Sequence, residues 1–171
     1  MKVKALENSV YTQITDYIIE NQNKFYRLAY SYVKNKEASL DIVQNAICKA
    51  LENYESIRNI QYIKTWFYKV LVNECLTYIK KYNKEILVDQ DSILEEAYIE
   101  DGYDVDSDLY EIVGKLNSNI KTVIILHYYE DMTLNEIAKV TGTNINTVKT
   151  RLYSGLRKLK GYMKEGDQNV R

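Results

Sequence analysis

Apolar residues recur every three or four positions through the first half of the chain, which is the spacing that places them on one face of an α-helix. This period predicts three helices, over about residues 11–34, 37–55 and 61–82. The apolar stripe of the second helix is formed by Leu40, Val43, Ile47, Ala50, Leu51 and Tyr54. The residues expected to be buried on the third helix are Ile63, Phe67, Val70 and Leu71.

The C-terminal third carries the pattern of a helix-turn-helix unit. Thr133 and Glu136 have the spacing of a capping box at the start of a short helix, and Gly142 is expected to end that helix in the left-handed conformation. Ala138 is the small residue needed where two helices cross, and Val148 is a β-branched anchor behind the second helix. Because the chain contains no proline, these periodic stretches predict an all-α protein.

The helices around this unit have local signals of their own. Asn117 or Ser118 can cap the helix that precedes it, and Asn144 can cap its second helix. His127 falls on the apolar face of the preceding helix, so we interpret it as a packed histidine rather than a ligand or a catalytic base. Gly155 lies on the apolar side of the second helix, where a missing side chain permits close helix approach. That side is formed by Ile145, Val148, Leu152, Leu156 and Leu159.

The opposite face of the second helix is polar and basic. Short hydrogen-bonding groups and cations are the side chains that reach base edges and phosphates in a major groove. Arg151 and Lys158 lie to the side, where phosphate contact is more natural. We therefore predict DNA binding here, the alternative being a solvated face on a small bundle. The face comprises Asn146, Thr147, Lys149, Thr150, Tyr153, Ser154 and Arg157.

A second row of cations and amides follows the third predicted helix. From Lys69 to Lys80 the rise is about 16 Å, enough to follow a nucleic-acid strand. Tyr62, Trp66 and Tyr68 stand in front of this row, and aromatic rings beside a basic stripe suit the stacking of unpaired bases. Ordinary packing remains the alternative for any one of these tyrosines. The row comprises Thr65, Lys69, Asn73, Thr77, Lys80 and Lys81.

The formal net charge of −1 is unexpected for a protein that binds DNA, but the charge is segregated. Residues 1–84 hold 13 Lys/Arg against 8 Asp/Glu, and residues 112–171 hold 10 against 5. Residues 85–111 hold 11 acids and no base. A self-repelling strip of this kind predicts a linker, so we expect two small helical domains, 1–84 and 112–171, joined by an acidic tether.

Composition excludes several other classes of protein. Cys48, Cys75 and a single histidine are too few and wrongly spaced for a zinc site, and we interpret the thiols as reduced. The chain has no apolar run that could span a membrane and no apolar signal core, so we expect a cytoplasmic protein. It also lacks a Gly-rich phosphate loop, a Cys/His pair in motif context and a metal-ligand cluster. We therefore expect no enzymatic activity and no cofactor.

Taken together, these segments resemble the extracytoplasmic-function group of bacterial sigma-70 family sigma factors. The stretches DIVQNAICKALENY and IKTWFYKVLVNECLTYIKK are similar to region 2 of that family. The stretch LHYYEDMTLNEIAKVTGTNINTVKTRLYSGLRKLK is similar to region 4. The resemblance implies a promoter-specificity subunit of RNA polymerase that acts in a stress or cell-envelope response.

The resemblance also implies roles for individual residues and partners. Asp41, Gln44 and Asn45 match the surface that docks on the clamp helices of the largest polymerase subunit, and region 4 members contact the flap of the second-largest subunit. The loop 56–62 with the aromatic and polar residues of the third helix matches the part that opens and reads the −10 element. Those residues are Tyr62, Trp66, Tyr68, Lys69, Asn73, Thr77 and Lys80.

The remaining implied partners are promoter DNA at the −35 element, contacted by residues 146–157, and an anti-sigma factor, which in this family is often membrane-bound. The linker matches the segment that threads toward the polymerase active-site cleft. The chain departs from the family pattern at Leu40, Thr77 and Ser154, and at 117–119, where a proline is common. The alternative function is an autonomous helix-turn-helix regulator whose first domain senses a signal or dimerises.

Overall fold

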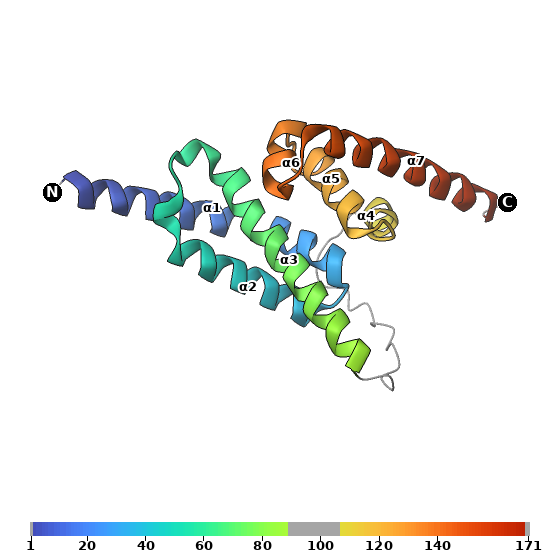
Figure 1. Ribbon diagram of the computed structural model, residues 1–171, viewed down its shortest axis with the longest axis horizontal. Coiled ribbons are helices and arrows are strands. Elements are labelled where there is room, and N and C mark those ends of the chain that lie inside the picture. Colours follow the sequence, from blue (N-terminus) through green and yellow to red (C-terminus); the bar gives the residue numbers. More distant parts are fainter. Residues whose placement is uncertain (1, 89–106, 170–171) are drawn as a thin grey trace. The chain divides into compact units, whose positions relative to one another are not determined.

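The computed structural model describes residues 2–88 and 107–169, and the chain divides into two compact units, Met1–Ile99 and Glu100–Arg171 (Figure 1). The first unit contains α1 (Lys2–Val33), α2 (Lys36–Glu52), the 3₁₀ turns η1 (Tyr54–Ser56) and η2 (Ile60–Tyr62), and α3 (Ile63–Val88). The second contains α4 (Ser107–Gly114), α5 (Ser118–Tyr128), α6 (Leu134–Thr141) and α7 (Ile145–Asn169). All the described elements are helical, which confirms the predicted fold class.

The ends of the predicted acidic linker, residues 85–111, are helical. α3 continues to Val88, and α4 begins at Ser107 and places Tyr110 in the core, where its ring contacts Tyr129 edge-on with centroids 4.8 Å apart. The rest of the predicted linker, 89–106, lies outside the described residues. The second unit therefore starts before the predicted boundary at residue 112.

In the first unit, α1 packs against both α2 and α3 (Figure 1). α1 and α2 are joined by a tight turn in which Lys34 adopts a left-handed φ of 49°. Asn35 then caps α2, its side-chain oxygen accepting the Ala38 N–H at 2.9 Å. α1 begins at residue 2, nine residues before the predicted start, and Ile14 near the start of the predicted helix is fully buried.

The buried side of α2 differs from the predicted stripe. Leu40 is exposed, and Ile47, Leu51 and Tyr54 are only half-buried. α2 lies between α1 and α3, and small side chains allow both neighbours to approach. The residues that are buried are Ala38, Ser39, Ile42, Val43, Ala46 and Ala50.

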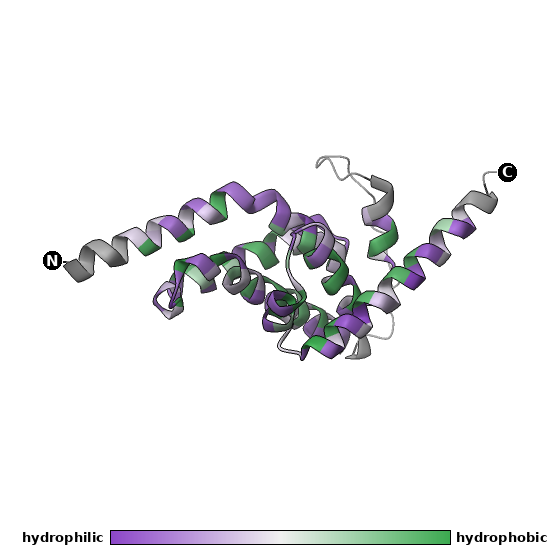
Figure 2. Cartoon of the chain, turned by 90° about the horizontal axis from the view of Figure 1, so that it is seen from above, coloured by the Kyte–Doolittle hydropathy of each residue, from purple (hydrophilic) through white to green (hydrophobic). Residues whose placement is uncertain are grey.

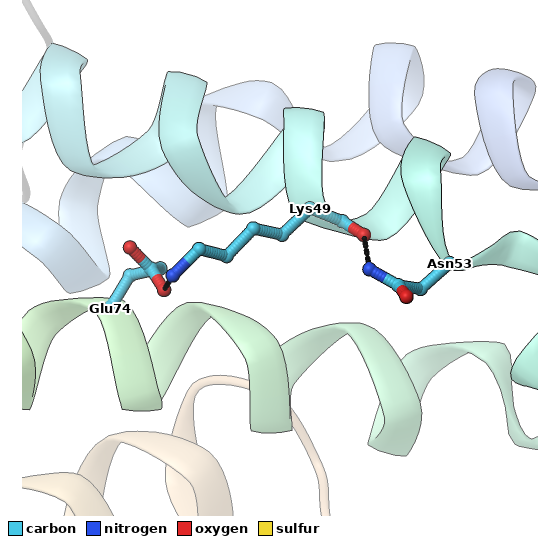
Figure 3. A network of polar contacts seen from close by, with 3 residues as sticks. All are labelled: Lys49, Asn53 and Glu74. Atoms are coloured by element: carbon cyan, nitrogen blue, oxygen red, sulfur yellow. Dashed lines mark hydrogen bonds and ion pairs between the residues drawn. The ribbon is translucent and has the colours of Figure 1, made fainter.

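The buried side of α3 also differs from the predicted one. Phe67 and Leu71 are buried as expected, but Ile63 and Val70 are half-buried. α2 and α3 are tied together by the Lys49 ammonium, which forms an ion pair with the carboxylate of Glu74 (Figure 3). The full set of buried side chains on α3 is Phe67, Tyr68, Leu71, Val72 and Cys75.

The second unit contains the helix caps and the helix-ending glycine that the sequence predicted. Asn117, rather than Ser118, caps α5 by accepting the Ile120 N–H at 3.1 Å. Thr133 and Glu136 form the capping box of α6: the Thr133 hydroxyl accepts the Glu136 N–H at 3.2 Å, and Glu136 accepts the Thr133 N–H at 2.8 Å. Gly142 ends α6 with a left-handed φ of 64°.

α7 lies against α5 at Gly155, as the missing side chain predicted. A Cβ atom built at this position would stand 2.8 Å from Ile120 Cγ2 and 2.9 Å from Ile124 Cγ1, closer than real Cβ atoms approach other groups. Polar and apolar residues alternate along α7, which continues to residue 169 (Figure 2). Of its predicted apolar stripe, Val148, Leu152 and Leu159 are buried, Ile145 is half-buried and Leu156 is exposed.

Candidate nucleic-acid interface

The exposed side of α7 is built on a capped helix N-terminus. The Asn144 side-chain oxygen accepts the Thr147 N–H at 2.8 Å and the Thr147 hydroxyl at 3.1 Å, which confirms the predicted cap. The buried Val148 and Leu152 fix the rotation of the helix against the rest of the unit. Because the start and the rotation of α7 are both fixed, its polar face has a defined direction.

This face is open to solvent over most of its length. Tyr153 is 63% exposed, the largest exposed fraction of any aromatic residue on this helix. Thr147, Arg151 and Ser154 are half-buried, so they lie toward the flanks of the face. No acidic residue occurs between 145 and 164, so the face is positively charged throughout. The exposed members are Asn146, Lys149, Thr150, Tyr153 and Arg157.

A second exposed face lies on α3. Lys69, Asn73, Thr77 and Lys80 are all exposed at intervals of three or four residues, so most of the predicted row shares one side of the helix, whereas Thr65 is half-buried. Tyr62, just before α3, is 56% exposed. These residues present cations, an amide and an aromatic ring together to solvent, a combination that can bind a backbone and stack on bases.

The prediction that Tyr68 contacts bases is wrong. Its side chain is fully buried, with its ring edge-on to Phe25 and the centroids 5.5 Å apart. The helical period does not distinguish an aromatic residue that packs under a polar face from one that stands beside it. Trp66 is half-buried, and its indole N–H donates to the Ser56 hydroxyl at 3.2 Å, which ties it to the α2–α3 loop (residues 53–62).

The loop also carries exposed polar residues that the sequence prediction did not single out. Arg58 and Gln61 are exposed beside Tyr62. Asn59 caps the η2 turn, since its side-chain oxygen accepts the Gln61 N–H at 2.9 Å. The family resemblance assigned the loop 56–62 to the −10 element as a whole, without distinguishing these residues from their neighbours.

The exposed side of α2 holds the predicted polymerase-docking residues. Asp41, Gln44 and Asn45 are all exposed. Leu40, which the apolar pattern assigned to the core, is 43% exposed, and it stands one helical turn before Gln44. This side of α2 therefore combines polar groups with an apolar one, as the centre of a protein–protein interface commonly does.

The two cysteines and the single histidine differ in burial and in their contacts. Cys75 is buried in the core, and this burial, reinforced by the charge of Glu74, raises the pKa of its thiol. Cys48 is exposed and unpaired. His127 is half-buried, with Nδ1 2.9 Å from the Met132 carbonyl oxygen.

Within residues 2–88 and 107–169, no group of His, Cys, Asp and Glu side chains could hold a metal ion. No helix in the same residues is both long and apolar enough to cross a membrane.

Comparison with known families gives matches in both units of the chain. The family described as Sigma-70 region 2 matches residues 18–85, and that described as Sigma-70, region 4 matches residues 107–159. RNA polymerase sigma factor SigV of Bacillus subtilis (strain 168) is 44% identical over 143 residues, 84% of this chain and 86% of that protein. The chain belongs to the sigma-70 family, in its extracytoplasmic-function group. It is thus an RNA polymerase sigma factor for transcription initiation.

Other sigma factors agree with this assignment along nearly the whole chain. The ECF RNA polymerase sigma factor SigW of Bacillus subtilis (strain 168) is 23% identical over 180 residues, 96% of each chain. The solved structure of the sigma factor RpoE from Bartonella quintana, in complex with the anti-sigma factor NepR, has a TM-score of 0.77 at 20% identity. That match covers 88% of this sigma factor and 96% of RpoE, and it shows the shared fold.

Proposed function

We propose that the two exposed faces of this sigma factor divide the work of promoter recognition. α3 and the α2–α3 loop open and read the −10 element, and α7 reads the −35 element in the major groove. The observation that supports this most directly is the coincidence of each face with a separate family match, region 2 for α3 and region 4 for α7. The exposed side of α2 docks on the clamp helices of the largest polymerase subunit, and the second unit contacts the flap of the second-largest subunit.

The decisive experiment reconstitutes the full chain with bacterial core polymerase. Run-off transcription of linear genomic fragments, followed by mapping of the RNA 5′ ends, should give a defined set of start sites with a common −10 and −35 sequence. Core polymerase alone provides the control. An autonomous regulator would bind DNA without conferring specific initiation on the core enzyme, and this result would reject the proposal.

We infer further that an anti-sigma factor holds this protein inactive in the cytoplasm until a stress or cell-envelope signal releases it. Support comes from the complex of the similar sigma factor RpoE with the anti-sigma factor NepR. Purification of the tagged chain from unstressed and stressed cells tests the inference. A small partner, membrane-bound or not, should replace polymerase subunits in the unstressed sample. Equal recovery of polymerase from both samples would contradict it.

Polymerase docking leads to a prediction for α2. The double variant Asp41→Ala with Gln44→Ala should bind core polymerase more weakly by about 1–3 kcal/mol, because it removes two exposed polar groups from the proposed interface. A titration of labelled protein with core polymerase measures the change. Glu52→Ala, which removes an exposed acid at the far end of the same helix, should bind normally. Unchanged affinity of the double variant would reject the docking surface.

Promoter opening leads to a prediction for α3. Asn73→Ala and Trp66→Ala should each reduce open-complex formation more than initial promoter binding. The Trp66 ring can stack on an unpaired base, which contributes about 1–3 kcal/mol, and the Asn73 amide can form hydrogen bonds with a base edge. Permanganate reactivity of thymines near the start site measures opening, and competition binding at low temperature measures the closed complex. Asn73 is fully exposed, so its variant should keep its fold, whereas the Trp66 variant needs a circular dichroism control. Normal thymine reactivity in both variants would reject the melting role.

A further inference from the structure

The first half of α1, which precedes the region 2 match at residue 18, contacts both the start of the α2–α3 loop and the α3 helix that follows the loop. At the start of the loop, Tyr11 contacts Tyr54 edge-on, with ring centroids 5.3 Å apart and planes at 82°. On α3, five residues beyond the end of the loop, Tyr17 contacts the buried Phe67 edge-on, with centroids 6.3 Å apart and planes at 71°. One helix therefore contacts both the first turn of the loop and the helix that follows it.

The segment of α1 that makes these contacts is rigidly placed. Tyr11 and Tyr17 are separated by about 9 Å along the helix axis. Between them, Ile14 is fully buried, so the segment belongs to the core of the first unit rather than to a frayed helix end. The positions of the two aromatic contacts are consequently set by the same core that places α2 and α3.

The loop has internal ties as well. Asn53 at its start donates its side-chain N–H to the Lys49 carbonyl oxygen at 2.8 Å, and Lys49 is itself paired with Glu74 on α3 (Figure 3). Across the loop, the Trp66 indole N–H donates to Ser56 at 3.2 Å. These contacts restrict the conformations that are open to the loop.

We propose that the Tyr11–Tyr17 segment of α1 sets the shape of the α2–α3 loop before DNA arrives, and that Tyr11 is the positioning residue for promoter opening. The inference rests on the proposed function of the loop. A loop already shaped for unpaired bases loses less conformational freedom on binding them, which strengthens binding without a new contact to DNA. Without the Tyr11 ring, Tyr54 of η1 loses its aromatic contact with α1, and the exposed Arg58, Gln61 and Tyr62 are held less firmly in their arrangement.

The test compares Tyr11→Ala with Tyr11→Phe in the full chain, each assembled with core polymerase on a promoter found by the transcription mapping. Tyr11→Ala should lower the extent of promoter opening, measured by permanganate reactivity, by about 2- to 10-fold, the range expected for one aromatic pair. Tyr11→Phe keeps the ring contact and should restore opening. Ile19→Ala, which shortens a 61% exposed side chain on the same helix, should open DNA normally.

A second measurement separates positioning from a general loss of structure. Tyr11 is 42% exposed, so Tyr11→Ala should lower the thermal midpoint only slightly and leave the affinity for core polymerase unchanged. In a double-variant cycle with Tyr54→Ala, the combined variant should open promoters to the same extent as the more impaired of the two single variants, because both substitutions remove the same contact. Additive effects, or a parallel loss of polymerase affinity, would overturn the inference.

Failure of the proposed function and failure of the inference about Tyr11 would give different results. If the wild-type holoenzyme opened no promoter, the proposed function would be rejected and this inference with it. If the wild type opened promoters and Tyr11→Ala opened them to the same extent, the inference alone would be rejected.

Discussion

Core RNA polymerase should raise the affinity of the full-length chain for promoter DNA by about 10²–10⁴-fold, the gain typical when two binding modules are held together. Alone, the chain has a net charge of −1, with 11 acids concentrated in residues 85–111. Two faces that each contact a few phosphates should bind at about 10⁻⁴–10⁻⁶ M at physiological salt. Polymerase would hold the two units at a fixed spacing and bind the acidic strip in a basic channel.

Anisotropy titrations can isolate the contribution of the acidic strip. A fragment of residues 107–171 should bind a −35 duplex more tightly than the full-length chain, because it lacks nine of the 11 acids and has a formal charge of +3. The fragment has to begin at Ser107 rather than at residue 112, since Tyr110 and Val113 of α4 are in the core of this unit. The difference should shrink as salt is raised. Nanomolar binding by the full-length chain alone would contradict the prediction and favour an autonomous regulator.

Gly155→Leu should lower the free energy of unfolding of the second unit by about 1–3 kcal/mol or more, the usual cost of overpacking a core. Even a Cβ at this position would stand 2.8–2.9 Å from Ile120 and Ile124, so α5 and α7 have to separate to admit a larger side chain. Separation of these helices also moves the polar face of α7 relative to α6. Binding to a −35 duplex should therefore fall along with stability.

Gly161→Leu is the matched control on the same helix. Nothing lies within 4 Å of a Cβ at Gly161, so leucine there meets open space and should raise stability slightly through its better helix propensity. Urea denaturation of the 107–171 fragment, followed by circular dichroism, gives both changes. A Gly155→Leu variant as stable as the Gly161→Leu variant would show that α5 and α7 do not need the close approach.

The local features of the second unit could be predicted from the sequence because their partners are a few residues apart. The capping box joins Thr133 to Glu136, and the caps at Asn117 and Asn144 bind N–H groups three residues onward. Gly142 is the residue type that adopts a left-handed conformation at least cost. The exposed faces of α3 and α7 followed in the same way from the helical period, apart from Tyr68.

The side on which each helix of the first unit is buried was decided by its neighbours. Leu40 and Tyr68 both lie on helices with apolar residues on more than one face. The hydrophobic pattern of these helices therefore does not determine which side of each helix faces the core. α2 presents small residues to α1 and α3 and leaves Leu40 exposed, because close packing depends on the shapes of all three helices. For the same reason Tyr68 is buried, in contact with Phe25 of α1.

The sequence by itself determined most of the helices, the caps of α5, α6 and α7, and the two polar faces, since these depend on interactions within one or two turns. The tertiary structure alone decided which long-range contacts shape the α2–α3 loop. Tyr11 and Tyr54 are separated by 43 positions in the chain, and the hydrophobic pattern of neither helix indicates that their rings meet. Only the packing of α1 against α2 and α3 brings them together, because the shared core fixes the direction in which each side chain points.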